Sequence, residues 1–314
     1  MAIRYLRSNE IDFSAWNKCI ENAINGSIFA YTWYLEIVSP KWEALVEDDY
    51  KSVMPILSTK FFGFKIFTQS KFVYFSGIYS NLLIDKHLTE RFLSKLPKEL
   101  TNININLNKY NRIDESNSIV AGKKNIFELD IIRKYTFLRN QYHPWLEKTL
   151  QKIEKNNINI ISGIQSNELV NLHLKNSKYS FFSLKESEIK KFRLLTSITL
   201  RNNTGEIIGA YSNNVLQAAA VFVSSHNNVH LLFYAQTRNG FKSKLLYSIV
   251  DFFIKKHAEK NITISVYPTG RLSKYFDLKM YGAQLTEHFC LYQNCLPWYL
   301  KHILKKLGNL KNFI

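Results

Sequence analysis

Several segments of the chain predict strands, either because apolar and polar residues alternate with a period of two or because a short run is apolar throughout. Residues 229–235 form a mainly apolar run, which leads into a polar loop and then into a helix with an apolar face at helical spacing. Over the second half of the chain the pattern predicts a helix at 142–157, strand 158–164, helices 167–176 and 185–200, a hairpin with a third strand over 206–236, helix 241–258, strand 262–267, helix 271–280 and strand 286–293.

This order predicts the fold class. Consecutive antiparallel strands, followed by one strand that passes through a helix to a neighbouring strand, give an α/β fold with a mixed sheet.

The pattern of elements repeats along the chain. Residues 45–57 and 210–222, which are 165 positions apart, each have two apolar strands flanking a two-residue polar turn. A helix at 85–100 lies near the counterpart of the one at 241–260, and a short alternating strand follows each. The alternative is coincidence, since individual identities are few. We therefore expect two tandem units related by an internal pseudo-repeat, one over 1–140 and one over 141–314.

Length and composition exclude several classes. The 314 residues are 46% hydrophobic and 21% charged, enough for a sizeable core and too apolar for a disordered chain. No run of about 20 apolar residues predicts a membrane span, and the N-terminus lacks the apolar segment of a signal peptide. We expect a soluble cytoplasmic protein. Its three cysteines predict buried thiols, and we expect no metal site.

The net charge of +17 is unevenly distributed. Residues 1–140 carry 19 Lys and Arg against 15 Asp and Glu, whereas residues 141–314 carry 23 against 10. A basic excess in one half suggests a nucleic acid, a phosphate-bearing cofactor or an acidic membrane surface as partner. The alternative is a solvated basic face.

The segment 228–256 contains the most informative loop. A strand that ends in a loop before a helix presents backbone N–H groups and a positive helix end to an anion. Gly240 allows close approach of the backbone, and Arg238, Lys242 and Lys244 add positive charge. The alternative is an ordinary strand-to-helix turn.

The strand with QTRNGFKS (236–243) and the following helix resembles the acyl-donor motif of the GNAT acyltransferases, although Gln236 and Gly240 stand one residue further apart than in that motif. The resemblance implies that this loop binds the pyrophosphate of an acyl-coenzyme A, as a co-substrate with no tightly bound cofactor. The implied donor-binding residues are Ala235, Gln236, Arg238, Asn239, Gly240, Phe241, Lys242 and Ser243.

The tandem arrangement resembles more closely the Fem-type peptidoglycan aminoacyltransferases and their GNAT-like relatives. Residues 31–47 look like the aromatic start of the first unit. The end of the chain resembles that family at Lys279, Tyr281, Gly282, Ala283, Asn294, Pro297 and Trp298. The resemblance implies a donor site in the second unit and a degenerate first unit on the acceptor side, with the acceptor between them. It also implies acyl or aminoacyl transfer from acyl-coenzyme A or aminoacyl-tRNA to an amine or hydroxyl on a small molecule or cell-envelope precursor.

Such a transfer needs donors for the developing oxyanion and a route for the acceptor's proton. Backbone N–H groups at Tyr234 and Ala235 are candidate donors. His230 and Tyr234, together with Leu232, share one face of the strand by alternation, and Tyr267 ends the next strand. We therefore identify His230, Tyr234 and Tyr267 as candidate acids or bases. The alternative for each is a core residue.

Two other functions stay open. One is a non-catalytic binding module on a decayed acyltransferase scaffold. The other is a sequence-tolerant nucleic-acid binder, ranked last because no known motif is present, and DNA is not expected as a partner. The tail 298–314 has the pattern of a basic amphipathic helix, which suits peripheral contact with an anionic membrane or a place in the core.

Overall fold

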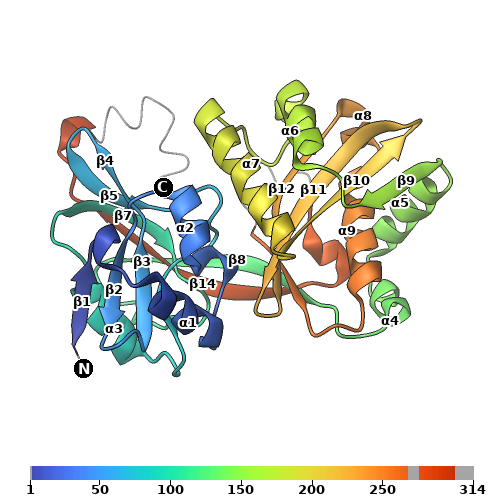
Figure 1. The fold of residues 1–314 in the computed structure, drawn as a ribbon. Coiled ribbons are helices and arrows are strands. Elements are labelled where there is room, and N and C mark those ends of the chain that lie inside the picture. The colour runs from blue at the N-terminus through green and yellow to red at the C-terminus, as the bar shows by residue number, and fades with distance from the viewer. Residues whose placement is uncertain (1, 268–275, 301–314) are drawn as a thin grey trace. The chain divides into compact units, whose positions relative to one another are not determined.

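The computed structural model describes residues 2–267 and 276–300. The chain divides into two compact units (Figure 1). Unit 1 is Met1–Lys124 with Glu287–Ile314, and unit 2 is Asn125–Thr286. The units predicted from the sequence, 1–140 and 141–314, have different bounds, because the chain returns to unit 1 at its end. The predicted helix 271–280 falls mostly outside the described residues, as does the tail from 301.

Unit 1 contains two groups of paired strands. The first, entirely antiparallel, has the order β1-β2-β3-β6, and the second has the order β4-β5-β7-β14. The strands are β1 (Ile3–Leu6), β2 (Glu43–Glu47), β3 (Ser52–Ile56), β4 (Ser58–Phe61), β5 (Phe64–Thr68), β6 (Tyr79–Ser80), β7 (Leu100–Asn106) and β14 (Gln284–Asn294). The helices are α1 (Phe13–Asn22), α2 (Thr32–Val38) and α3 (Lys86–Ser94), with 3-10 turns at Ser8–Glu10 and Ile28–Ala30.

Unit 2 contains a mixed sheet with helices on both faces. Its strands follow the order β8-β13-β12-β11-β10-β9, in which β12 and β13 are parallel. The strands are β8 (Val120–Asp130), β9 (Ile158–Ser162), β10 (Gly205–Ser212), β11 (Val215–Ser225), β12 (Asn228–Gln236) and β13 (Thr263–Val266). The helices are α4 (Tyr135–Asn140), α5 (Pro144–Glu154), α6 (Ser166–Lys175), α7 (Glu186–Arg201), α8 (Arg238–Lys242) and α9 (Leu245–His257), with 3-10 turns η3 (Ser177–Tyr179) and η4 (Leu278–Tyr281).

These elements confirm the predicted mixed α/β fold. Both predicted hairpins form: β2 pairs with β3, and β10 pairs with β11. The turn of the second hairpin is Asn213-Asn214, and both residues have positive φ, which is typical of the type I′ turn that suits twisted antiparallel strands. The tandem pseudo-repeat stays a prediction.

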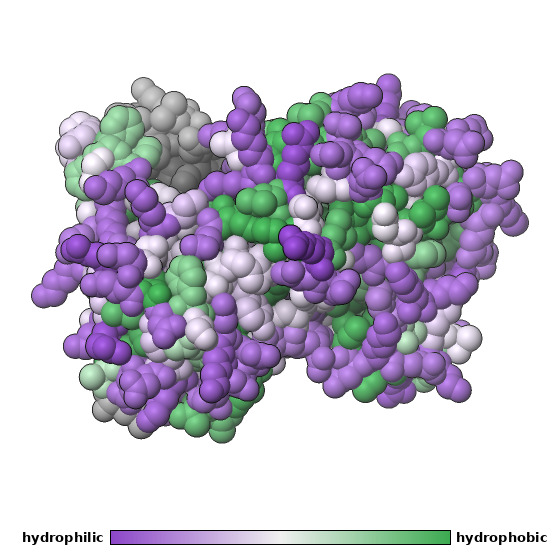
Figure 2. Space-filling model, viewed as in Figure 1, coloured by the Kyte–Doolittle hydropathy of each residue, from purple (hydrophilic) through white to green (hydrophobic). Residues whose placement is uncertain are grey.

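The core of unit 2 lies on both faces of its sheet. Helices α6 and α7 pack on one face, where the ring of Phe233 lies 4.9 Å from that of Phe192. Helix α9 packs on the other, where Phe222 and Phe253 stack at 4.3 Å. Hydrophilic residues cover most of the surface that Figure 2 shows, as expected when apolar groups are buried inside each unit.

Hydrogen bonds and ion pairs hold α9 in place near both of its ends and in its middle. Near its N-terminus the Tyr281 hydroxyl donates to the backbone carbonyl of Tyr247 at 2.6 Å. In its middle the buried Asp251 carboxylate accepts from the hydroxyls of Tyr135 and Tyr142 at 3.0 and 2.9 Å, and burial raises the pKa of Asp251. This helix follows the candidate donor loop, so its fixed position also fixes the loop.

At the C-terminal end of α9, Glu206 of β10 accepts from Lys256 at 2.6 Å and lies 2.8 Å from His257 Nε2. Ser162 of β9 also donates to it. Burial alone would raise the pKa of Glu206, but the bonds from His257, Lys256 and Ser162 outweigh burial and lower it from 4.5 to about 2. The ionised carboxylate therefore stabilises the fold.

We expect Glu206→Gln to lower the free energy of unfolding by about 1–3 kcal/mol at pH 7, because charge-assisted hydrogen bonds are lost. The folded pKa of about 2 lies below the ordinary 4.5, so this stabilisation is present above pH 4.5 and disappears as the pH falls toward 2. Urea denaturation between pH 3 and 7 measures both effects.

The matched control is Glu259→Gln, which removes an exposed carboxylate beyond the end of the same helix and should leave stability nearly unchanged. A stability difference between wild type and Glu206→Gln that stays constant across this pH range would contradict the assignment.

Candidate functional site

The candidate site lies where two parallel strands separate. Strand β12 pairs with β13 only over Asn228–His230, yet it continues to Gln236. β13 pairs with β8 on its other side. From Leu231 onward β12 thus has a sheet partner, β11, along one edge only. Where no second strand covers the edge of a strand inside a fold, the N–H and C=O groups of that edge are satisfied by another segment or by a ligand.

A β-bulge interrupts β12 at Leu232. Phe222 of β11 lies opposite Leu231, and the next residue, Val221, lies opposite Phe233, so Leu232 is extra. A single extra residue reverses which face each later side chain takes. His230 therefore faces α6 and α7, and Tyr234 faces α9.

The bulge corrects the expectation that His230, Leu232 and Tyr234 share one face. Ring contacts agree with it: Phe233 contacts His173 and Phe192 on one face, and Phe222 contacts Phe253 on the other. Both His230 and Tyr234 are buried, with 6% and 1% of their surfaces exposed. They therefore do not share one face of β12, as alternation had implied.

The backbone of Tyr234 lies on the edge of β12 that no longer pairs with β13, which we call the separated edge. The Tyr234 carbonyl accepts from the Phe181 amide at 3.0 Å, so this carbonyl points away from β11. Because bonded and non-bonded pairs alternate along antiparallel strands, Ala235 bonds to Ala219 of β11. Of the two predicted oxyanion donors, the Tyr234 amide points to the open edge and the Ala235 amide does not. The Gln236 amide points the same way as that of Tyr234.

Beyond β12, the predicted donor loop is a short helix. Thr237 caps α8: its Oγ1 accepts from the Gly240 amide at 3.0 Å, and its carbonyl accepts from the Phe241 amide. Two of the loop's N–H groups are therefore used inside the protein. A pyrophosphate bound here would therefore not use the Gly240 and Phe241 amides.

Close packing explains the glycine at 240. A Cβ there would lie 2.3 Å from the backbone carbonyl oxygen of Gln217 on β11. Thr237 donates its backbone N–H to that same carbonyl at 2.8 Å. The contact between α8 and β11 requires glycine whether or not a ligand binds.

The basic side chains of the loop face solvent. Arg238, Asn239, Lys242 and Ser243 are all exposed. Lys244 has φ +59°, a left-handed conformation that separates α8 from α9 and leaves the first turn of α9 without a side-chain cap. Positive side chains and a positive helix end thus occur together here.

Two aromatic rings extend this basic surface. Tyr179 of η3 stacks on Phe241 of α8, with ring centroids 5.4 Å apart. Lys178 lies 6.0 Å from the Tyr179 ring and Lys244 lies 5.1 Å from the Phe241 ring. Residues 178, 179, 241 and 244 form what we call the cation–aromatic cluster. The sequence analysis missed it, since the contact joins residues more than 60 positions apart and no local pattern marks Tyr179.

One buried polar atom at this site has no partner in the described residues. The side-chain oxygen of Gln236 forms no hydrogen bond, and only 3% of the residue is exposed. A buried acceptor without a donor is unfavourable by about 1–3 kcal/mol. An N–H group of a bound molecule would remove that cost. Tyr267, the third candidate catalytic residue, follows β13 and is also buried.

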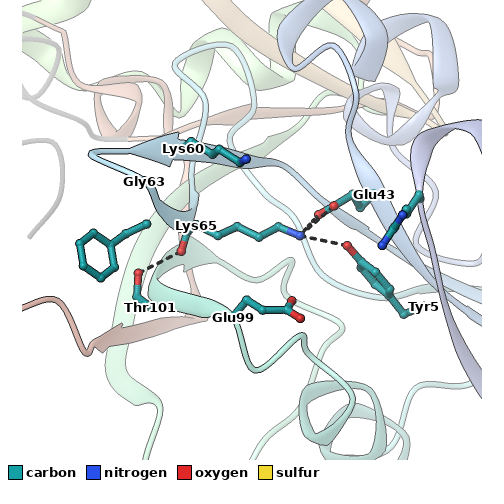
Figure 3. A pocket seen from close by; sticks show the side chains of 9 residues that line it. Tyr5, Glu43, Lys60, Gly63, Lys65, Glu99 and Thr101 are labelled. Atoms are coloured by element: carbon teal, nitrogen blue, oxygen red, sulfur yellow. Dashed lines mark hydrogen bonds and ion pairs between the residues drawn. The ribbon is translucent and has the colours of Figure 1, made fainter.

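Unit 1 has a pocket of about 500 Å³ with charges of both signs (Figure 3). Lys65 donates to Glu43 at 2.7 Å and to the Tyr5 hydroxyl at 3.0 Å, and Ser58 also donates to Glu43. Tyr5 and Glu43 belong to β1 and β2, whereas Ser58 and Lys65 belong to β4 and β5. The cluster therefore joins the two strand groups of unit 1, and its members satisfy one another. We interpret it as structural.

Among the described residues, no group of three or more His, Cys, Asp or Glu side chains has the geometry of a metal site, and no helix is long and apolar enough to cross a membrane.

Comparisons with known proteins give structural neighbours only. No protein-family model matches the chain, and no curated protein matches its sequence. The structure of FemX superposes with a TM-score of 0.59 at 9% identity, covering 92% of this chain and 97% of FemX. The C-terminal domain of a putative lysylphosphatidylglycerol synthetase from Agrobacterium fabrum gives 0.54 at 8% identity, covering 91% and 93%. L-PGS from Bacillus licheniformis gives 0.52 at 10% identity, covering 93% and 95%. The fold is thus similar to that of FemX, of the putative synthetase domain and of L-PGS, as the sequence resemblance had implied.

We expect Gly240→Ala to destabilise unit 2 by about 1–3 kcal/mol, because the added methyl group meets a backbone carbonyl that cannot move aside cheaply. Chemical denaturation measures the change. Asn239→Ala, one residue earlier in α8 and exposed, is the control and should change stability little. A Gly240→Ala variant as stable as wild type would show that α8 does not pack on β11 as described.

Proposed function

We propose that the protein transfers an acyl or aminoacyl group from acyl-coenzyme A or aminoacyl-tRNA to an amine or hydroxyl. The observation that carries the proposal is the separated edge of β12. It directs backbone N–H groups of Tyr234 and Gln236 to one place, next to a basic loop that leads into α9. The similarity to the folds of FemX, of the putative lysylphosphatidylglycerol synthetase domain and of L-PGS supports it.

The chemistry needs few side chains. The acceptor's nitrogen or oxygen attacks the carbonyl carbon of the donor's thioester or ester, and a tetrahedral oxyanion forms. Fixed N–H donors stabilise that oxyanion, and the Tyr234 amide is our candidate for one of them. The C–S or C–O bond then breaks, and the leaving thiolate or alkoxide takes up a proton equivalent to the one that the acceptor loses. Holding the two reactants together supplies much of the rate enhancement.

The Tyr234 and Tyr267 hydroxyls stay candidates for moving that proton. His230 stays a candidate only for a separate position, since it lies on the opposite face of β12 from Tyr234. Tyr234 is the best placed of the three, because its backbone also borders the separated edge.

The donor loop favours recognition by side chains. The Gly240 and Phe241 amides are occupied, and the exposed side chains of Arg238 and Lys242 are our candidates to hold phosphates. The cation–aromatic cluster beside them offers rings and positive charge, which suit a nucleotide. Coenzyme A and the 3′ end of a tRNA both carry adenine and phosphates. A tRNA would use more of the exposed cations.

A binding module without catalysis is the second candidate. The Phe181 amide already occupies the Tyr234 carbonyl at the open edge, and the loop amides are satisfied internally. Both facts are expected if a donor site has been lost. This candidate predicts ligand binding at the loop with no consumption of the donor.

We expect Arg238→Ala with Lys242→Ala to weaken donor binding about tenfold or more, since both side chains are exposed and available to phosphates. The probes are coenzyme A, acetyl- and longer acyl-coenzyme A at about 1 mM in a thermal-shift panel, and total aminoacylated tRNA by fluorescence anisotropy. A ligand at a hundred times its Kd stabilises by about 2.7 kcal/mol, a clear shift in Tm. For tRNA, loss of two phosphate contacts should reduce the salt-dependence slope by about 1.4–1.8.

The control is Lys148→Ala with Lys152→Ala, which removes the same charge from exposed positions on α5. Equal loss in both double variants would indicate a non-specific effect of charge. A wild-type protein that binds neither thioesters nor tRNA would contradict the proposal, and binding without donor consumption would favour the binding module.

A further inference from the structure

Unit 1 carries a second pocket, of about 760 Å³, at a surface where aliphatic side chains are exposed. Leu82, Leu83 and Ile24 have 52%, 86% and 56% of their surfaces exposed. Tyr110, on a neighbouring loop, is 42% exposed. Clustered exposed apolar groups of this kind mark interaction sites more often than scattered ones do.

Cations adjoin both loops. Lys86 follows the first loop directly in the chain, and Lys109 and Arg112 flank Tyr110, with Lys109 Nζ 5.5 Å from its ring. Both loops thus combine apolar groups with cations. We call residues 24, 82–87 and 109–112 the amphipathic surface.

The acidic groups nearby are engaged. The Asp85 carboxylate caps α3 by accepting from the Leu88 amide at 2.7 Å. Asp114 pairs with Lys86 at 3.4 Å. Arg112 is exposed, and with Lys86 and Lys109 it outnumbers Asp85, so the surface keeps a positive balance.

Buried asparagines hold both loops in place. Asn25 donates to the Ile78 carbonyl at 2.7 Å and to Asn108 Oδ1 at 3.2 Å, and Asn111 Oδ1 accepts from the Ile78 amide at 2.6 Å. A Cβ at Gly77, which has φ +111°, would lie 2.2 Å from Asn111 Oδ1. The exposed leucines therefore stand on a fixed platform, and their exposure is not the result of a loosely packed loop.

We propose that the amphipathic surface docks the protein on an anionic phospholipid bilayer. Aliphatic groups enter the region between headgroups and acyl chains, a tyrosine lies at headgroup level, and lysine and arginine contact lipid phosphates. Charge complementarity favours this occupant, since cations border the leucines in both loops. The inference is independent of the proposed function.

The test is co-sedimentation with vesicles of phosphatidylcholine alone and with vesicles containing phosphatidylglycerol. Wild type should bind the anionic vesicles and bind the neutral ones much more weakly. Leu82→Ser with Leu83→Ser should reduce the partition coefficient about tenfold or more, because the buried apolar area is lost. Lys109→Ala with Arg112→Ala should reduce the partition coefficient about fivefold for each cation removed, measured at low salt.

Matched controls separate docking from general effects. Leu194→Ser on α7, where the leucine is 52% exposed, and Lys18→Ala with Lys98→Ala at exposed positions of unit 1 should bind vesicles as wild type does. All changed positions except Lys109 are exposed, and unchanged Tm values confirm that each variant is folded. Donor binding at the loop of unit 2 should also be unchanged.

Three results would overturn the inference: equal binding to neutral and anionic vesicles, unchanged binding by the two double variants, or no binding of wild type to any vesicle. The last result would instead favour a protein partner for this surface.

Discussion

The separation of β12 from β13 is the constraint on which the candidate site depends. Each residue of a strand carries an N–H and a C=O that require partners, and β12 keeps β11 along its whole length while it loses β13 after His230. The Phe181 amide satisfies one group of the separated edge, at Tyr234. The bulge at Leu232 adds twist where the strands part and turns Tyr234 toward α9. The edge, the bulge and the helix are therefore one structural arrangement.

Local patterns in the sequence were sufficient to predict most elements of unit 2. The Asn213-Asn214 turn marked the β10–β11 hairpin, and apolar spacing marked α9, because both signals act over a few residues. The bulge was not predictable in this way, since Leu232 looks like any residue of an apolar strand. It is defined only by which residues of β11 lie opposite, and that register is a tertiary property.

The same limit applies to the donor loop and to the units. The sequence marked Gly240 as conformationally special, but the reason lies in Gln217 of a different strand. Tyr179 had no signal at all, because its stacking partner is Phe241. The return of the chain to unit 1 at Glu287 also depends on strand pairing, here between β14 and β7, which separation along the sequence conceals.

Net charge predicted partners only coarsely, and the structure shows why. The second half of the chain has a large basic excess, yet Lys256 is paired with Glu206 and Arg139 with Glu147, so part of this charge is neutralised within the fold. The exposed cations that remain near α8 are a local subset, at 238 and 242, with the half-buried Lys244 beside them. The first half is nearly balanced in sum, but its acids near α3 are engaged as a helix cap and an ion pair. What an approaching anion meets is the set of charges left over after internal pairing, and that set follows from tertiary contacts, not from composition.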